Sequence, residues 1–160
     1  MIQALSSFYR RSLADDPTGD VGLDQEVALQ RAYLEIESAR FPDRLVTRFE
    51  IPQELDSASV PGMILQPLVE NAVKYAVAPT RKPVTVTIAA WEEAGCLAVA
   101  VTDSGPGGKK DPKSGFGIGL ANVRDRLEAR YGAEASLTAG STETGGWQAV
   151  IRLPLERHDG

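Results

Sequence analysis

Cysteine and long apolar runs are scarce in this sequence of 160 residues, and each scarcity excludes a class of protein. The single cysteine, Cys96, excludes a disulfide framework and a cysteine metal site, and its alternating apolar surroundings predict a small core residue. No stretch approaches the roughly 18 apolar residues of a membrane helix. The net charge of −5 argues against a nucleic-acid surface. We expect one cytoplasmic domain without a membrane segment; whether a full-length protein is membrane-anchored stays open.

The spacing of apolar residues predicts the order of helices and strands. Helices are expected over 2–14, 23–40, 63–78 and 118–131, and strands over 45–51, 84–88, 97–101, 135–139 and 147–153. A turn over 91–95 makes one strand pair antiparallel, and the glycine- and lysine-rich segment 104–117 is typical of a mobile loop. The order predicts an α+β fold: a two-layer α/β sandwich with a mixed, mostly antiparallel sheet, helices on one face and an N-terminal helical extension.

Polar side chains share one face of the helix predicted over 63–78. Glu70, Asn71, Lys74 and Tyr75 fall on this face, and the apolar residues of the helix fall on the other. An amide oxygen suits a hard cation, an ammonium suits phosphate, a ring suits a base, and a carboxylate can position a proton. The set fits a metal-bound nucleotide, although this segment alone is more typical of a solvated helix face.

Asp103 stands at the end of an apolar strand, and Gly105 and Gly107 follow it. A carboxylate in that place can accept from the exocyclic amine of adenine, and glycines let a ligand approach the backbone closely. By itself the pattern is also common in plain turns. Its position after a buried strand therefore matters more than its composition.

A second glycine segment precedes the helix predicted from Ile118. Gly115, Gly117 and Gly119 open this helix, and backbone N–H groups at a helix N-terminus bind phosphate. A P-loop requires Lys and Ser or Thr after its last glycine, whereas Leu120 and an alanine follow here. A dinucleotide fold places its glycine loop after the first strand, so neither known motif fits.

The three segments together resemble the N, G1 and G2 boxes of the GHKL ATP-binding superfamily of gyrase, heat-shock chaperone, histidine kinase and mismatch-repair ATPases. Residues 67–75, 103–107 and 117–127 carry the resemblance, which is closest to the LytS-like sensor histidine kinases. The resemblance implies a Bergerat ATP-binding fold that uses ATP and Mg²⁺. It also implies that residues 1–16 end a dimerisation and phosphoacceptor region and that residues 17–160 form the catalytic domain.

The resemblance implies a role for each matching residue. It places Mg²⁺ on Asn71, phosphate on Lys74, adenine beside Tyr75 and the adenine amine on Asp103. The residues that would surround the bound nucleotide are Gly105, Gly107, Gly115, Gly117, Ile118, Gly119 and Leu120. Glu70 would orient a proton acceptor and act with Lys74 in catalysis, although in kinases the role of Glu70 can belong to a residue beside the phosphoacceptor.

Two features depart from the pattern of these kinases. The phosphoacceptor segment, of the form Asn-Pro-His, does not occur here, and the sole histidine, His158, lies in a polar tail expected to be solvated. Trp147 follows a glycine pair where relatives often carry threonine, and Thr144 could supply the polar contact only if its turn bends back. We therefore expect a domain that donates the γ-phosphoryl of ATP to a histidine outside this chain.

The resemblance also implies partners: the phosphoacceptor helical domain of the same kinase, a response regulator and a second subunit. Three other functions stay open. They are an ATP-driven clamp of the gyrase and chaperone type, an anti-sigma-factor serine kinase, and an interaction module with a decayed pocket. A clamp of the gyrase type adds a large transducer domain to this fold. The anti-sigma-factor serine kinases lack the long helix predicted here over 23–40. A decayed pocket would be favoured if Asn71 or Asp103 were missing, and both are present.

Overall fold

A computed structural model describes residues 19–105 and 118–158 of the chain. Its helices are α2 (Leu23–Arg40), α3 (Gln66–Ala72), continued by a π-helix (Val73–Val77), and α4 (Ile118–Tyr131). Its strands are β1 (Asp20–Gly22), β2 (Leu45–Glu50), β3 (Ser59–Pro61), β4 (Val84–Glu93), β5 (Cys96–Asp103), β6 (Ser136–Ser141) and β7 (Trp147–Pro154). Short 3₁₀ turns cover Gln53–Leu55 and Gly132–Glu134.

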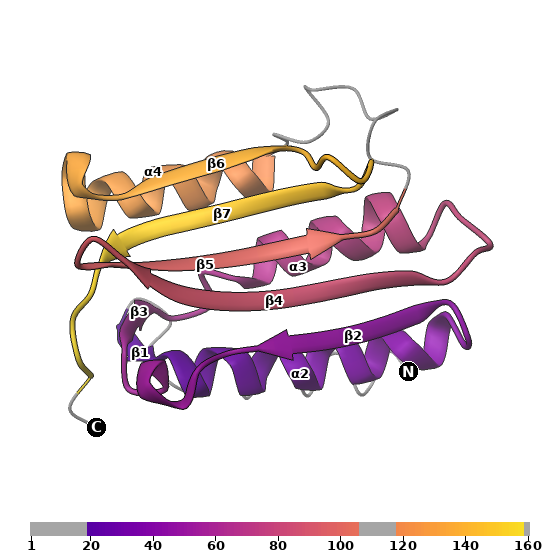
Figure 1. The fold of residues 1–160 in the computed structure, drawn as a ribbon, viewed down its shortest axis with the longest axis horizontal. Helices are drawn as coiled ribbons and strands as arrows, with labels where there is room; N and C mark the ends of the chain where they lie inside the picture. The colour runs from indigo at the N-terminus through magenta and orange to yellow at the C-terminus, as the bar shows by residue number, and fades with distance from the viewer. Residues whose placement is uncertain (1–18, 106–117, 159–160) are drawn as a thin grey trace.

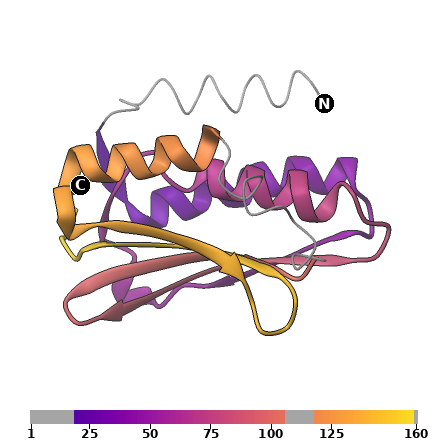
Figure 2. The same cartoon turned by 90° about the horizontal axis from the view of Figure 1, so that it is seen from above.

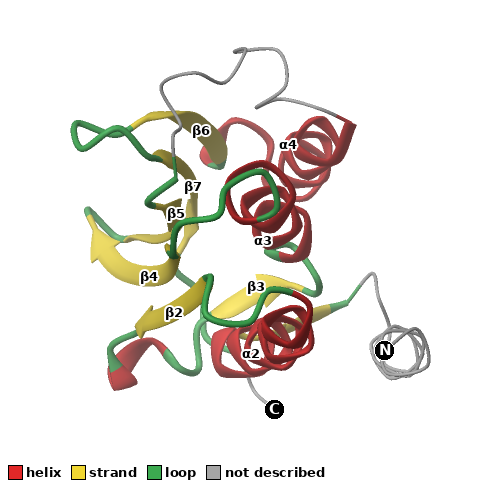
Figure 3. Cartoon of the chain, turned by 90° about the vertical axis from the view of Figure 1, so that its right-hand side faces the viewer, coloured by secondary structure: helices red, strands yellow, loops and turns green. Residues whose placement is uncertain are grey.

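The main sheet has five strands in the order β2-β4-β5-β7-β6 (Figure 1). β2 runs parallel to β4 because the chain crosses over through α3 between them, and the other neighbours are antiparallel. Seen along the sheet, α2, α3 and α4 all cover the same face (Figures 2 and 3). The predicted mixed two-layer sandwich with helices on one face is confirmed.

Alternating residues of β4 and β5 build the centre of the core. The side chains of Val86 and Ile88 are fully buried in it, and those of Val99 and Val101 on the neighbouring strand are at most 3% exposed. The opposite face carries threonines and alanines, over which Trp91 packs. The period of two that predicted these strands therefore separates the helix-covered face from the open face.

The helix predicted over 63–78 starts later than expected. Met63 has a left-handed backbone (φ 61°), and α3 begins only at Gln66, with Pro67 in its first turn. Pro67 lacks an N–H, which the first helical turn tolerates. The last turn widens into a π-helix, in which Ala78 N–H donates to the carbonyl of Val73 at 2.9 Å. Such π turns often occur at functional sites.

The hairpin between β4 and β5 is tighter than predicted. β4 continues to Glu93, and Ala94 and Gly95 alone form the turn, with φ of 52° and 79°. Two successive left-handed residues match the twist of the flanking strands. Cys96, the first residue of β5, is half-buried. The prediction that it belongs to the core is therefore wrong, because it lies beside the hairpin turn.

The short ribbon formed by β1 and β3 was not predicted, since each strand has only three residues. The predicted helix over 2–14 and the proposed boundary near residue 16 lie outside the described residues. Within residues 19–105 and 118–158, no helix is both long and apolar enough to cross a membrane.

The packing of α4 yields a test of stability. The hydroxyl of Tyr131 is buried without a hydrogen-bond partner among the described residues, and burial raises its pKa to about 12. Tyr131→Phe removes an unsatisfied group, so the free energy of unfolding in urea should stay equal or rise by up to about 1 kcal/mol. Leu127→Ala, in the same helix, should lose about 2–5 kcal/mol. A loss above 1 kcal/mol in Tyr131→Phe would contradict this packing.

Candidate nucleotide site

Asp103 ends β5 with its side chain buried at 3% exposure. One carboxylate oxygen accepts a hydrogen bond from the N–H of Gly105 at 3.0 Å. Ser104 pairs with β4 through its own N–H, which donates to the carbonyl of Thr85, and through its hydroxyl, which accepts from the N–H of Thr85. The predicted carboxylate at the end of a buried strand is confirmed, and the backbone around it is held on both sides.

Two glycines allow other segments to approach Asp103 closely. A Cβ on Gly105 would lie 2.8 Å from the Cβ of Ala76 in the π-helix. A Cβ on Gly146, in the turn before β7, would fall directly on the carbonyl oxygen of Asp103. The end of β5 is thus wedged between the helix layer and the turn that precedes β7.

The polar face predicted for α3 is present. Glu70, Asn71 and Tyr75 are half-buried and Lys74 is exposed, while Ala72 and Ala76 pack into the core. Glu70 accepts a hydrogen bond from the side-chain amide of Gln66 at 3.0 Å. The ammonium of Lys74 lies 5.2 Å from the centre of the Tyr75 ring. Ala76, on the apolar side of the same helix, contacts Gly105, so the π-helix lies beside the end of β5.

The first turn of α4 lies next to the first turn of α3. A Cβ on Gly119 would make an ordinary contact of 3.5 Å with the ring of Pro67, and Leu120 is buried in the core. α4 begins at Ile118, as predicted. Three of the glycines expected to surround the nucleotide, Gly107, Gly115 and Gly117, lie outside the described residues.

Trp147 is a neighbour of Asp103 that the sequence did not reveal. The two residues are paired across β5 and β7, so their side chains share the helix-covered face. The hydroxyl of Thr144 lies 3.1 Å from that of Thr142, which also accepts from the N–H of Gly146. Trp147, and not Thr144, is the residue paired with Asp103 across the two strands.

His158 lies at the opposite end of the sheet. Asp103 and Cys96 are the two ends of β5, about 23 Å apart at the rise of an antiparallel strand, and Pro154 pairs with Cys96. The backbone N–H of His158 donates to the carbonyl of Ser57 at 2.6 Å, and the residue is half-buried. The prediction of a solvated tail is wrong because the chain after β7 pairs with residues 57–59.

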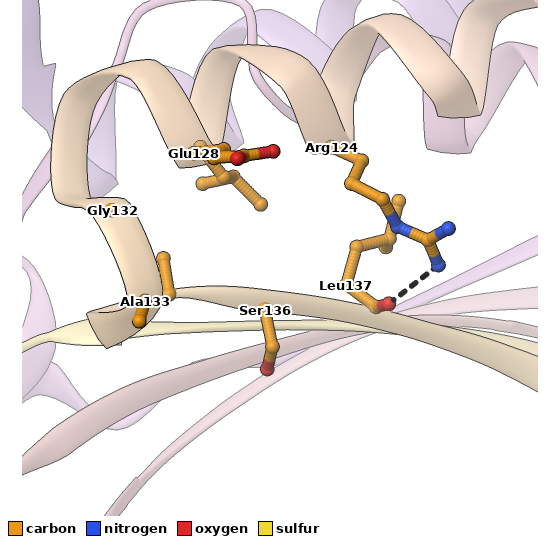
Figure 4. Close-up of a pocket in the computed structure, with 8 residues that line it drawn as sticks. Arg124, Glu128, Gly132, Ala133, Ser136 and Leu137 are labelled. Carbon is orange, nitrogen blue, oxygen red and sulfur yellow. Dashed lines mark hydrogen bonds between the residues drawn. The ribbon is translucent and has the colours of Figure 1, made fainter.

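Two hollows have linings that do not include Asp103, and the second takes in two of the predicted site residues. The first hollow, of about 360 Å³, opens between α4 and β6 (Figure 4). There the guanidinium of Arg124 donates to the carbonyl of Leu137. The second, of about 340 Å³, lies between α2 and α3. It brings Glu70 and Lys74 beside Glu37, a carboxylate of 2% exposure paired with Arg40 at 3.3 Å.

The family model for histidine kinase-, DNA gyrase B- and HSP90-like ATPases matches residues 58–157, and the model for histidine kinases matches residues 1–45. The chain belongs to this ATPase family. The sensor histidine kinase YesM of Bacillus subtilis (strain 168) is 33% identical over 157 residues, 96% of this chain and 27% of YesM. The sensor histidine kinase BtsS of Escherichia coli (strain K12) is 33% identical over 154 residues, with the same coverage.

Solved structures show the same fold. The catalytic domain of histidine kinase ThkA aligns with a TM-score of 0.63 at 18% identity, covering 85% of this chain and 94% of that domain. The histidine kinase AdeS of Acinetobacter baumannii aligns with a TM-score of 0.66 at 14% identity, covering 98% and 77%. The chain spans about a quarter of the length of its curated relatives.

The contact of Gly146 with Asp103 can be tested directly. Gly146→Ala places a methyl group on the carbonyl of Asp103, so we expect a loss of about 1–3 kcal/mol in unfolding free energy and weaker binding of ATP. Gly140→Ala is the matched control, because a Cβ there meets nothing within 4 Å. Urea titration and calorimetry give both quantities, and equal behaviour of the two variants would contradict the close packing.

Proposed function

We propose that this chain is the ATP-binding catalytic domain of a two-component sensor histidine kinase. The observation that carries the proposal is the buried carboxylate of Asp103, wedged between Gly146 and the Gly105–Ala76 contact at the end of a central strand. A fixed, desolvated acceptor in that place suits the exocyclic amine of adenine. The curated relatives, which are sensor histidine kinases, favour this function over a conformational clamp or a serine kinase.

The residues described around Asp103 can hold the remainder of Mg-ATP. In the proposed complex, Tyr75 and Trp147 would flank the base, Lys74 would bind phosphate, and the first turn of α4 at Gly119 would offer N–H groups to phosphate. Glu70, held by Gln66, would orient the acceptor for proton loss.

Mg²⁺ bound to ATP needs few protein ligands, because phosphate and water oxygens fill most of its octahedron. The amide oxygen of Asn71 suits it as a hard donor. The ion would neutralise charge on the transferred phosphoryl group.

The proposed acceptor is a histidine outside these 160 residues, on a helical domain of the same kinase, and a response regulator would receive the phosphoryl group next. His158 is the only histidine of the chain, and it is anchored about one strand length from Asp103. Phosphoryl transfer requires the acceptor in line with the γ-phosphate. We therefore expect that His158 does not serve as an intramolecular acceptor. A homodimer in the full-length kinase belongs to the same proposal.

The first test concerns the base. Asp103→Asn replaces one acceptor oxygen with a donor, so calorimetry should show Mg-ATP binding weakened by about 1.5–3 kcal/mol, the value of a hydrogen bond to a charged group. Asp43→Asn is the control: Asp43 is exposed and left-handed (φ 63°), a conformation that asparagine tolerates. If Asp103→Asn binds as tightly as the control, Asp103 does not read adenine.

The second test concerns phosphoryl transfer. Incubated alone with radiolabelled ATP, the chain should acquire no acid-labile label, because His158 cannot reach the γ-phosphate. Adding the helical phosphoacceptor domain of the same kinase should produce label on that domain. Asn71→Ala should abolish this transfer, and His158→Ala should leave it unchanged. Label on the chain alone that disappears with His158→Ala would refute the proposed division of roles.

A further inference from the structure

A buried carboxylate on α2 holds the turn that leads into α3. Glu26 is 1% exposed, and its oxygens accept hydrogen bonds from the N–H of Met63 at 2.8 Å and of Leu65 at 2.9 Å. Leu65 directly precedes α3, where backbone N–H groups lack carbonyl partners within the helix. Burial raises the pKa of Glu26, although these bonds and the charge of Arg126 oppose the rise.

Arg126 of α4 contacts the same turn. Its guanidinium donates to the carbonyl of Gly62 at 3.0 Å, and the residue is half-buried. Met63, whose N–H donates to Glu26, has a left-handed backbone, which is unfavourable for a side chain of its kind and persists only where its surroundings hold it. Residues 62–65 are therefore fixed between a carboxylate of α2 and a guanidinium of α4.

This turn lies close to both parts of the site that would bind phosphate and metal. In α3, Asn71 lies about 9 Å along the helix from Leu65. In α4, Gly119 lies about 10 Å before Arg126, which is two turns away on the same face of the helix. The first turns of the two helices already touch, where Gly119 meets Pro67. A shift of residues 62–65 would change the separation of these two helix ends.

We propose that Glu26 and Arg126 are a positioning pair, which fixes the start of α3 against α4 and thereby sets Asn71 against the backbone at Gly119. Neither side chain would touch nucleotide. The inference rests on the proposed function, since it assigns the pair to the phosphate and metal end of the ATP site. The adenine end is held separately, by the packing of Gly105 on Ala76.

The test compares two ligands in matched variants. Glu26→Gln keeps the shape of the side chain but brings an N–H₂ group against backbone donors, and Arg126→Gln removes the guanidinium. Glu35→Gln on α2 and Arg81→Gln, before β4, are controls, because both residues are exposed and lie outside this turn. Dissociation constants for Mg-ATP and for adenosine are measured by NMR titration, with folding verified by thermal unfolding.

We expect Mg-ATP binding to weaken about tenfold in Glu26→Gln and in Arg126→Gln, equivalent to about 1.4 kcal/mol, while adenosine binding stays within twofold. The double variant should be little weaker than the worse single variant, since both act on one turn. Arg126→Lys, which keeps a charged donor, should recover part of the affinity.

Unchanged Mg-ATP binding, or an equal loss for Mg-ATP and adenosine, would overturn the positioning role. The same titrations separate this outcome from failure of the proposed function. If the wild-type chain binds neither ligand, the proposed function fails and the inference fails with it. If the wild type binds both and the variants match the controls, the inference alone is refuted.

Discussion

The contact between the end of β5 and its two neighbours is the constraint on which the site depends. Asp103 is buried there because Gly105 lets the chain rest on Ala76, and Gly146 lets the turn before β7 rest on the Asp103 carbonyl. Side chains at either glycine would push these segments apart. The contacts made at Gly105 and Gly146 thus hold Asp103 at the edge of the helix layer, where we propose that the base binds.

The helix layer has three features that ordinary helical packing does not require: a late start of α3, a π-helical end, and buried polar side chains on α2. α3 starts only after a turn held by other elements, and it ends in a π-helix beside Gly105. The side of α2 that packs inward carries Glu26, Gln30 and Glu37, all at most 2% exposed. Buried polar groups cost stability unless they are paired, so their presence favours a role in fixing geometry.

Much of the fold could be predicted because its signals are local. The alternation of β4 and β5, the start of α4 at Ile118 and the position of Asp103 each depend on residues close in sequence. The start of α3 could not be predicted, since it depends on Glu26 and Arg126, which are about 40 and 60 residues away in the chain. The pairing of Trp147 with Asp103 could not be predicted either, because it depends on the register of β5 on β7.

Nucleotide is proposed to bind between the π-helix, the end of β5 and the start of α4. An NMR titration of isotope-labelled protein with Mg-ADP locates the binding site, because backbone amides and both indole N–H groups report at once. We expect the largest shifts at Gly105, Ala76 and the indole of Trp147, with Trp91 on the open face unaffected. Shifts concentrated instead at Arg124 and Ser136, in the hollow between α4 and β6, would contradict it.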